Sequence, residues 1–476
     1  MFRRIMIAAM TIVLLSGSSA RAAPPTTGTD VYSNFTLIDP AASRRIENAW
    51  IQVRDGRIAS VGRGRPPATA LAHAHDLGGR YMLPGFIDAH AHITATGIQK
   101  VEFRDGKPVI SSESDDRITR HNARITLARG VTTVRNPAGD PVANARYDRM
   151  IASGAWIGPE AVHAGAIHEP PPFSGGMFAY PVGAASWDAD AAREAALGMK
   201  YYKLYTDLSE AEVAEGIRAA HRHGLKAIGH LNKVSWLTAV ELGIDGLEHA
   251  LPTSPDLLEP AARKTYVAGL GPDSKYMYRW FELADYDGPI IQRLFRVLAR
   301  RHIPVDMTFV VNEIVANVDD MDRAYPAHER ADMDPQVLAA SITGLKASAT
   351  GWTAEDFRRA RAVMPKVLEF GRRLHQAGVP MMIGTDAGGG LFYGRELVLT
   401  GQAGISTWDV LRMATSETAG LIGMGERIGR IRKGYEADLV ILDADPLADL
   451  AAAEKVHAVI NDGQLLDLAE LRREDR

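Results

Sequence analysis

Two histidines with one residue between them, His90 and His92, follow a short apolar run in the stretch YMLPGFIDAHAHIT at 81–94. If residues 85–92 form a strand, side chains at positions i and i+2 point to the same face of it. Both imidazoles would then enter one space at the carboxyl end of the strand. Two imidazoles on one face supply half of the ligands of a tetrahedral metal site. The alternative interpretation is a polar strand end with two solvated histidines.

The long middle of the chain, about 81–424, alternates strand-like and helix-like segments. One helix is clearly marked after YYKLYTDL (201–208), where Ser209 and Glu212 form a capping box and Gly224 ends the apolar face. Strands that alternate with helices predict an α/β protein with a parallel sheet, and eight such strands predict a (β/α)8 TIM barrel. The segments that we expect to be strands are 85–92, 130–136, 161–167, 201–208, 225–231, 243–250, 303–310 and 379–388.

Polar side chains stand at the carboxyl ends of several of these segments. A barrel gathers the ends of its strands at one rim, so residues that are distant in the sequence meet there. A single histidine is more often structural than a ligand, but four histidines and an aspartate at one rim are hard to ascribe to chance. The polar residues at these strand ends are His90, His92, Lys203, His230, His249 and Asp386, and the histidines and the aspartate among them could ligate a metal ion.

The 476-residue chain has 24% charged residues, a net charge of −4 and no cysteine. This charge balance, without a long basic run, argues against a nucleic-acid partner. Because there is no cysteine, a metal ion would be held by histidine, a carboxylate or a modified side chain. Nitrogen and oxygen ligands of this kind favour Zn, Mn, Co or Fe.

Both ends of the chain have a β-rich pattern. Short alternating runs surround the turn signals Asp55-Gly56 and Asp462-Gly463. Since the ends of a chain often lie close together, we expect 23–80 and 425–476 to form one small β-sandwich domain beside the barrel of 81–424.

The first residues resemble a secretory signal peptide. Arg3 and Arg4 precede a short apolar segment, and Ala20-Arg21-Ala22 fits the small-residue cleavage rule. We therefore predict that residues 1–22 are removed, and that the mature protein is exported, periplasmic or secreted. The apolar segment is too short to span a bilayer, so no stable membrane span is expected after cleavage.

The chain resembles the amidohydrolase superfamily, and within it the imidazolonepropionase-like and Xaa-Pro dipeptidase-like enzymes. The resemblance extends from about residue 30 to 465, and it implies a metal-dependent hydrolase that cleaves an amide (C–N) bond. It is carried by LPGFIDAHAH, ARGVTTVRN, YYKLYTDL, HGLKAIGHL, GIDGLEHA, GVPMMIGTDAG, AGISTWDVLRMATSETAGLIG and IGRIRKGYEADLVILDADPLAD.

The resemblance also implies roles for the site residues. His90 and His92 would bind one metal ion together with Asp386, and the other two histidines, His230 and His249, would bind a second, with two Zn ions as the first expectation. Lys203 would bridge the two. An ammonium group cannot ligate a cation, whereas a carbamate on the same side chain can. Lys203 is therefore either N6-carboxylated or not a ligand.

Asp386 would act as general base and then as general acid, by taking a proton from water and passing it to the leaving group. The expected substrate is a small molecule or a short peptide, most simply a dipeptide or an N-acyl amino compound. Tyr205 shares a face with Lys203 and could donate to the carbonyl oxygen. His168 and Arg395 are further candidates for substrate contacts; the alternative for Arg395 is a position on a helix surface beside Glu396 as its partner.

Several alternatives stay open on the sequence alone. The same site would serve a ring hydrolase for imidazolone-like or hydantoin-like cyclic amides, or a lactonase or esterase. A deaminase is less favoured, because Lys233 stands where a glutamate usually follows the strand-5 histidine by three positions. A non-catalytic binding protein is the remaining class. HEPPPFSGGM at 168–177 departs from prolidase-like members and puts a proline-peptide specificity in doubt. The long segments 251–300 and 311–352 are either pocket walls or packing helices, and a homo-oligomer is not decided by the sequence.

Overall fold

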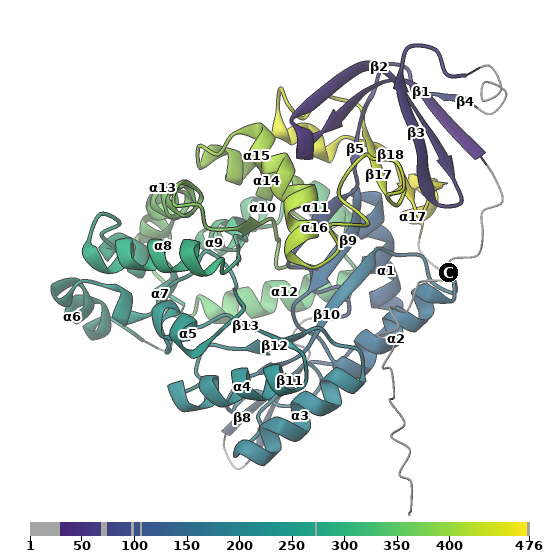
Figure 1. Ribbon diagram of the computed structural model, residues 1–476. Coiled ribbons are helices and arrows are strands. Elements are labelled where there is room, and N and C mark those ends of the chain that lie inside the picture. Colours follow the sequence, from purple (N-terminus) through teal and green to yellow (C-terminus); the bar gives the residue numbers. More distant parts are fainter. Residues whose placement is uncertain (1–28, 68–73, 97–99, 105–106, 272–273, 474–476) are drawn as a thin grey trace, which may run out of the picture.

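The computed structural model describes residues 29–67, 74–96, 100–104, 107–271 and 274–473. The predicted signal peptide lies outside these residues. In the middle of the chain, parallel strands form one curled sheet in the order β6-β9-β10-β12-β13-β14-β15-β16 (Figure 1). These strands are β6 (Phe86–Asp88), β9 (Val131–Asn136), β10 (Glu160–His168), β12 (Tyr201–Leu204), β13 (Lys226–Gly229), β14 (Gly246–Leu247), β15 (Val305–Asp306) and β16 (Met381–Met382), and β11 (Phe178–Ala179) pairs with β10.

The first and last strands of this sheet are joined by hydrogen bonds just beyond their ends. The backbone N–H of Ala89 donates to the carbonyl of Ile383 at 2.7 Å, and that of His92 donates to Ala387 at 3.0 Å. Ala91 and Ala387 form a parallel bridge. The curled sheet therefore meets itself at the segments that carry His90 and Asp386, as a barrel-like arrangement requires.

Each of the eight predicted strand segments overlaps one of these strands, so the predicted strand order is confirmed. Seven of the strands are shorter than predicted, with two residues each in β14 and β16, whereas β10 extends one residue beyond its predicted segment at either end. The residues that follow β14 and β16 leave the extended conformation: φ is +64° at His249 and +58° at Asp386. These two site residues therefore lie in turns that follow their strands, whereas Lys203 lies within β12.

Helices cover the outside of the curled sheet (Figure 1). Helix α4 begins with the predicted capping box, in which Ser209 and Glu212 bond each other's backbone N–H groups. Its buried face includes Val213 and Ile217. The covering helices include α1 (Asp116–Ala128), α2 (Pro141–Ala152), α3 (Ala184–Ala196), α4 (Glu210–Arg222), α5 (Trp236–Leu242), α8 (Pro289–Arg301), α13 (Ala354–Gln376) and α14 (Tyr393–Gln402).

The two long segments have different roles. In 251–300, α6 (Pro260–Ala268) and α7 (Tyr276–Leu283) carry aromatic side chains that are buried in the main core, Trp280 and Phe281 among them. Of the two alternatives, pocket wall or packing helices, the segment 251–300 therefore forms packing helices. The segment 311–352 contains helix α12 (Pro335–Ser348), which has no buried residue. The other helices of this region are α9 (Phe309–Ala316), α10 (Met321–Ala324) and α11 (Ala327–Asp332).

Strands from both chain ends form a second sheet with its own apolar core, in the order β19-β18-β17-β5-β1-β2-β3 with β4 on β1. Both predicted hairpin turns are confirmed, at Asp55-Gly56 and at Asp462-Gly463. The described strands of the two ends make one hydrogen-bonded sheet, so they do not confirm the predicted sandwich. The strands are β1 (Thr29–Asp39), β2 (Arg44–Arg54), β3 (Arg57–Arg63), β4 (Ala74–Asp76), β5 (Tyr81–Pro84), β17 (Leu439–Leu442), β18 (Val456–Asn461) and β19 (Gln464–Leu466).

A hairpin of β7 (Lys100–Arg104) and β8 (Lys107–Ser111) stands apart from both sheets. The remaining short helices are α15 (Thr407–Arg412), α16 (Thr418–Leu421) and α17 (Leu468–Leu471). Among the helices of the described residues, none is both long enough and apolar enough to cross a membrane.

Gly85 lies between β5, in the sheet formed by both chain ends, and β6, in the curled sheet, so it connects the two sheets. A Cβ at this position would lie 2.1 Å from Oγ1 of Thr132. We expect Gly85→Ala to lose about 1–3 kcal/mol of stability, because the overpacked side chains must move. Thermal unfolding followed by circular dichroism measures the loss.

The control for this substitution is Gly420→Ala. Gly420 is in α16, and a Cβ there meets nothing within 4 Å. Its effect should stay within about 0.5 kcal/mol. If the two variants unfold at the same temperature, the close approach between Gly85 and Thr132 does not constrain the fold.

Candidate metal centre

The two histidines of the HAH stretch converge on one carboxylate oxygen. Nε2 of His92 lies 2.9 Å from Oδ1 of Asp386, and Nε2 of His90 lies 3.2 Å from the same oxygen. The two imidazole centroids are 5.2 Å apart. The ligand atoms of the three residues lie within 4.8 Å of one another, which is close enough for one metal ion to bind them all.

Two further histidines continue the cluster across the rim. The ring of His249 lies 4.5 Å from that of His90 and 4.3 Å from that of His230, measured between centroids. Both ring nitrogens of His230 are buried and lack a hydrogen-bond partner among the described residues. Burial of unpaired polar atoms is costly, so these nitrogens fit the role of metal ligands.

The electrostatics of the cluster suit a cation. Burial, reinforced by the charge of Lys203, lowers the pKa of His230 to about 3, so its imidazole is neutral and offers a lone pair. Burial alone would raise the pKa of Asp386, but the neighbouring His249 and His90 hold it well below the usual range. A neutral imidazole and an ionised carboxylate are the forms that bind metal.

Lys203 is buried at the same rim, and its Nζ has no hydrogen-bond partner among the described residues. The carboxylate oxygen Oε2 of Glu248 lies 3.8 Å away. Burial lowers the pKa of Lys203 and outweighs the attraction of Glu248 and Asp306, which favours the neutral amine. The six residues singled out from the sequence therefore gather at one rim, and the ligand atoms of His90, His92 and Asp386 lie close enough together to share a metal ion.

A buried charge network that the sequence prediction did not include lies beneath the cluster. Arg135 on β9 donates to both oxygens of Glu248, each at 2.8 Å, and to Oδ2 of Asp306 at 2.6 Å. All three side chains are inaccessible to solvent. Each is a charged residue inside a segment that we expected to be a buried strand, GVTTVRN, GIDGLEHA or IPVDMTFV, and this could have served as a signal because buried charges must be paired.

Asp306 connects this network to the ligands. Its Oδ2 accepts a hydrogen bond from Nδ1 of His90 at 2.7 Å, which leaves Nε2 of His90 facing Asp386. Its Oδ1 accepts from the backbone N–H of His249 at 2.8 Å. A carboxylate that orients a histidine from its other nitrogen is the usual support of a metal ligand.

The backbone is strained at the ligands. His249 and Asp386 adopt the left-handed conformation, as does Thr308, whose φ is +40°. Nδ1 of His249 bonds Oγ1 of Thr308 at 2.8 Å, and the N–H of Asp386 donates to the carbonyl of His90 at 2.7 Å. Strained non-glycine residues are held in this way mainly at functional sites.

A cavity of about 420 Å³ opens beside the cluster. His92, Thr385 and Asp386 form its polar floor, and Tyr205 lines it with its ring 4.9 Å from that of His230. The Thr385 hydroxyl donates to Oδ2 of Asp88 at 2.8 Å. Most of the other lining side chains are apolar, and several come from 311–352, so this segment is a pocket wall.

His168 does not line the cavity among its described residues. It is buried, its Nδ1 donates to the carbonyl of Lys203 at 2.8 Å, and its Nε2 bonds Asp190 at 2.8 Å. Its ring stacks on that of Tyr202 at 3.9 Å. His168 therefore supports the strand that carries Lys203, and its polar atoms face away from the cavity.

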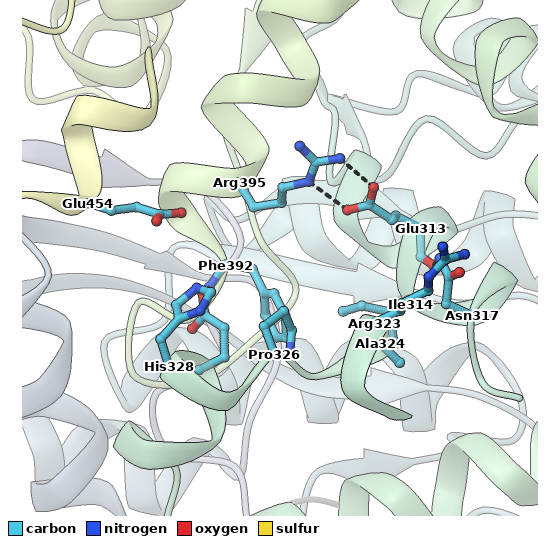
Figure 2. Close-up of a pocket in the computed structure, with 11 residues that line it drawn as sticks. Glu313, Ile314, Asn317, Arg323, Ala324, Pro326, His328, Phe392, Arg395 and Glu454 are labelled. Carbon is cyan, nitrogen blue, oxygen red and sulfur yellow. Dashed lines mark hydrogen bonds and ion pairs between the residues drawn. The ribbon is translucent and has the colours of Figure 1, made fainter. Parts of the chain in front are cut away.

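Arg395 lies at a second cavity, of about 350 Å³. Figure 2 shows its guanidinium against Glu313, to which it donates at 2.7 and 2.5 Å. The expected alternative partner, Glu396, is instead buried and accepts from the N–H of Val310 at 2.8 Å. Because two of its N–H groups already donate to Glu313, the guanidinium of Arg395 is not available for bidentate binding of a substrate carboxylate.

Comparisons with known proteins agree with the geometry. Two models described as the amidohydrolase family match residues 74–171 and 299–466. The imidazolonepropionase of Sphingopyxis alaskensis is 26% identical over 272 residues, which span 49% of this chain and 66% of the relative. That of Rhizorhabdus wittichii is 27% identical over 288 residues, which span 51% and 70%. The matches thus span about two thirds of these relatives.

Solved structures share the fold over nearly the whole chain. A Xaa-Pro dipeptidase with bound methionine in the active site superposes with a TM-score of 0.66 at 19% identity, covering 92% of this chain and 100% of that one. The ochratoxinase of A. niger gives 0.62 at 18% identity, covering 92% and 95%. The chain is a member of the amidohydrolase superfamily. Its relatives place it among hydrolases that act on carbon–nitrogen bonds, and they confirm the resemblance found in the sequence.

Asp306→Asn tests the support of His90. The amide keeps the size of the side chain but removes the anionic acceptor for Nδ1 and leaves Arg135 with one charged partner fewer. We expect the affinity for a divalent metal to fall about 10–100-fold, as is usual when such a partner is lost. Competition with a fluorescent chelator measures this affinity.

Asp438→Asn is the matched control. Asp438 is also buried and accepts from the N–H of Asp462 at 2.7 Å, but it stands next to β17 in the sheet formed by the chain ends, outside the network beneath His90. Its substitution should leave metal affinity unchanged. Equal metal affinity of Asp306→Asn and the parent protein would show that Asp306 does not position the ligand.

Proposed function

We propose that this protein is an exported, metal-dependent amidohydrolase that hydrolyses an amide bond in a dipeptide or an N-acyl amino compound. One observation carries the proposal: six side chains from five strands meet at one rim, and buried donor atoms of Lys203 and His230 have no partner among the described residues. The same cluster reaches a cavity that a small molecule can enter, because His92 and Asp386 line that cavity.

His90, His92 and Asp386 would hold one divalent ion, and His230 and His249 would hold a second. Zn is the first expectation, with Mn, Co or Fe as alternatives. Such ions, when bound, lower the pKa of water and polarise the carbonyl group. Water adds across the C–N bond, so that the products are a carboxylic acid and an amine.

The residues of the chain supply positioning and proton transfer. Asp386 borders the cavity floor and would take a proton from the attacking water, then deliver it to the leaving nitrogen. Tyr205, which lines the same cavity, would donate to the carbonyl oxygen. Asp306 and Thr308 hold His90 and His249 by their Nδ1 atoms throughout.

Lys203 is proposed to be carboxylated on Nζ and to bridge the two ions. Its buried amine has no hydrogen-bond partner among the described residues, and Arg135 already pairs with the nearest carboxylate, Glu248. A carbamate on this amine would give the buried nitrogen the polar partners that it lacks.

A ring hydrolase for cyclic amides is a second candidate. The likeness to imidazolonepropionases over about half of the chain favours it, and the same residues would serve it. A rate screen that pairs linear N-acyl compounds with hydantoins and imidazolones of similar size distinguishes the two.

Lys203→Ala tests the metal bridge. The parent protein should contain close to two transition-metal ions per chain by mass spectrometry, and the variant should lose at least about 100-fold in kcat/KM, because the second ion loses its bridge. Short carboxylates such as propionate should restore part of the rate by occupying the vacated space.

Lys200→Ala, which removes an exposed lysine three positions earlier, should behave like the parent. One ion per chain together with an active Lys203→Ala would contradict the bridge.

The export proposal has its own test. In a host that secretes the protein, the mature chain should begin at Ala23, as intact mass and amino-terminal sequencing can establish. Replacing Ala20 and Ala22 by leucine should leave the precursor uncut, because the cleavage site requires small residues. Recovery of a full-length active protein from the cytoplasm of its natural source would contradict export.

A further inference from the structure

The cavity beside the metal centre has a polar floor and apolar walls. One wall is an apolar cluster after β10, with Phe173, Met177 and Phe178, which also contacts Tyr205. Across from the floor, α9 and α12 supply further apolar side chains. The described lining outside the floor includes Ile167, Phe173, Met177, Phe178, Val311, Ile314, Val315, Tyr325, Met333, Val337, Ser341, Leu345, Leu391 and Phe392.

Helix α12 presents one face to this cavity. Val337, Ser341 and Leu345 follow one another at four-residue spacing, so they share a side of the helix, and all three line the cavity. None of them is buried, although two are apolar. Phe173 and Ile314 on the neighbouring walls are likewise only half-buried. These side chains have apolar surface left for a ligand to cover.

Among the described lining residues there is no lysine or arginine. The nearest candidate from the sequence, Arg395, pairs with Glu313 at the second cavity. The one carboxylate of the described lining, Asp386, belongs to the floor, and the walls offer an anion no partner. A substrate carboxylate placed between these walls would therefore lose its water without gaining a partner.

We propose that the cavity receives a large, uncharged apolar group of the substrate, aromatic or branched aliphatic, and that the cavity face of α12 selects it. This inference rests on the proposed hydrolysis of an amide. Within that function it assigns neutral hydrophobic amides as the substrate class, and it makes free dipeptides with a charged end in the cavity poor substrates. Ser341, at the centre of the α12 face, is a specificity-determining position.

A matched substrate pair tests this proposal. N-(4-methylbenzoyl)phenylalaninamide carries no charge, and N-(4-carboxybenzoyl)phenylalanine carries a carboxylate on each side of the same amide bond. Whichever side enters the cavity, only the second compound brings a charge into it. We expect kcat/KM of the metal-loaded protein to be at least tenfold higher for the uncharged compound.

Ser341→Arg tests whether the cavity face of α12 sets the preference for the uncharged compound. A guanidinium at the centre of the α12 face should pair with the carboxylate and reduce the preference at least fivefold, through KM. Thr343→Arg adds the same charge to the exposed side of α12 and should keep the parent preference. Ser341→Lys is the second variant if Ser341→Arg does not fold, as judged by circular dichroism.

Binding to the metal-free protein separates the cavity from the chemistry. Calorimetry should give a dissociation constant at least tenfold lower for the uncharged compound. If neither compound is hydrolysed but this binding preference holds, the proposed function fails and the cavity inference stands. Equal binding of the two compounds, or tighter binding of the charged one, overturns the inference even if both are hydrolysed.

Discussion

The metal centre depends on how Arg135 pairs with two carboxylates that are buried from solvent. Glu248 and Asp306 lie side by side beneath the histidines, and Arg135 donates to both. Two such buried charges could not stay ionised together without a cation between them. Because Arg135 supplies it, Asp306 remains an acceptor for His90 and for the backbone of His249. One ion network thus orients two ligands that stand on different strands.

The meeting of the first and last strands completes the site. Asp386 reaches His90 and His92 because its own backbone bonds the carbonyl of His90. The left-handed turns at His249 and Asp386 then direct both side chains toward the centre. Strand pairing holds this strained backbone in place, so the geometry of the ligands follows from the closure of the sheet.

Recognition and chemistry use different parts of the fold. The ligands stand at the ends of parallel strands, whereas the cavity walls come from the segment after β10 and from α9 to α12. Helices and loops outside a barrel can change without moving the strand ends. The same rim can therefore serve substrates of different shape, and the walls decide which of them fits.

The sequence by itself determined the order of the strands, the hairpins at Asp55-Gly56 and Asp462-Gly463, and the polar residues that end the strands. These follow from local rules, the alternation of strands and the preferences of turns, which act over a few residues. Only the tertiary structure decided the partners of side chains. Arg395 pairs with Glu313, which is 82 positions away, and His168 turns from the cavity to Asp190. The same holds for the charge network of Arg135, Glu248 and Asp306, because a buried charge takes its partner from whichever segment packing brings within reach.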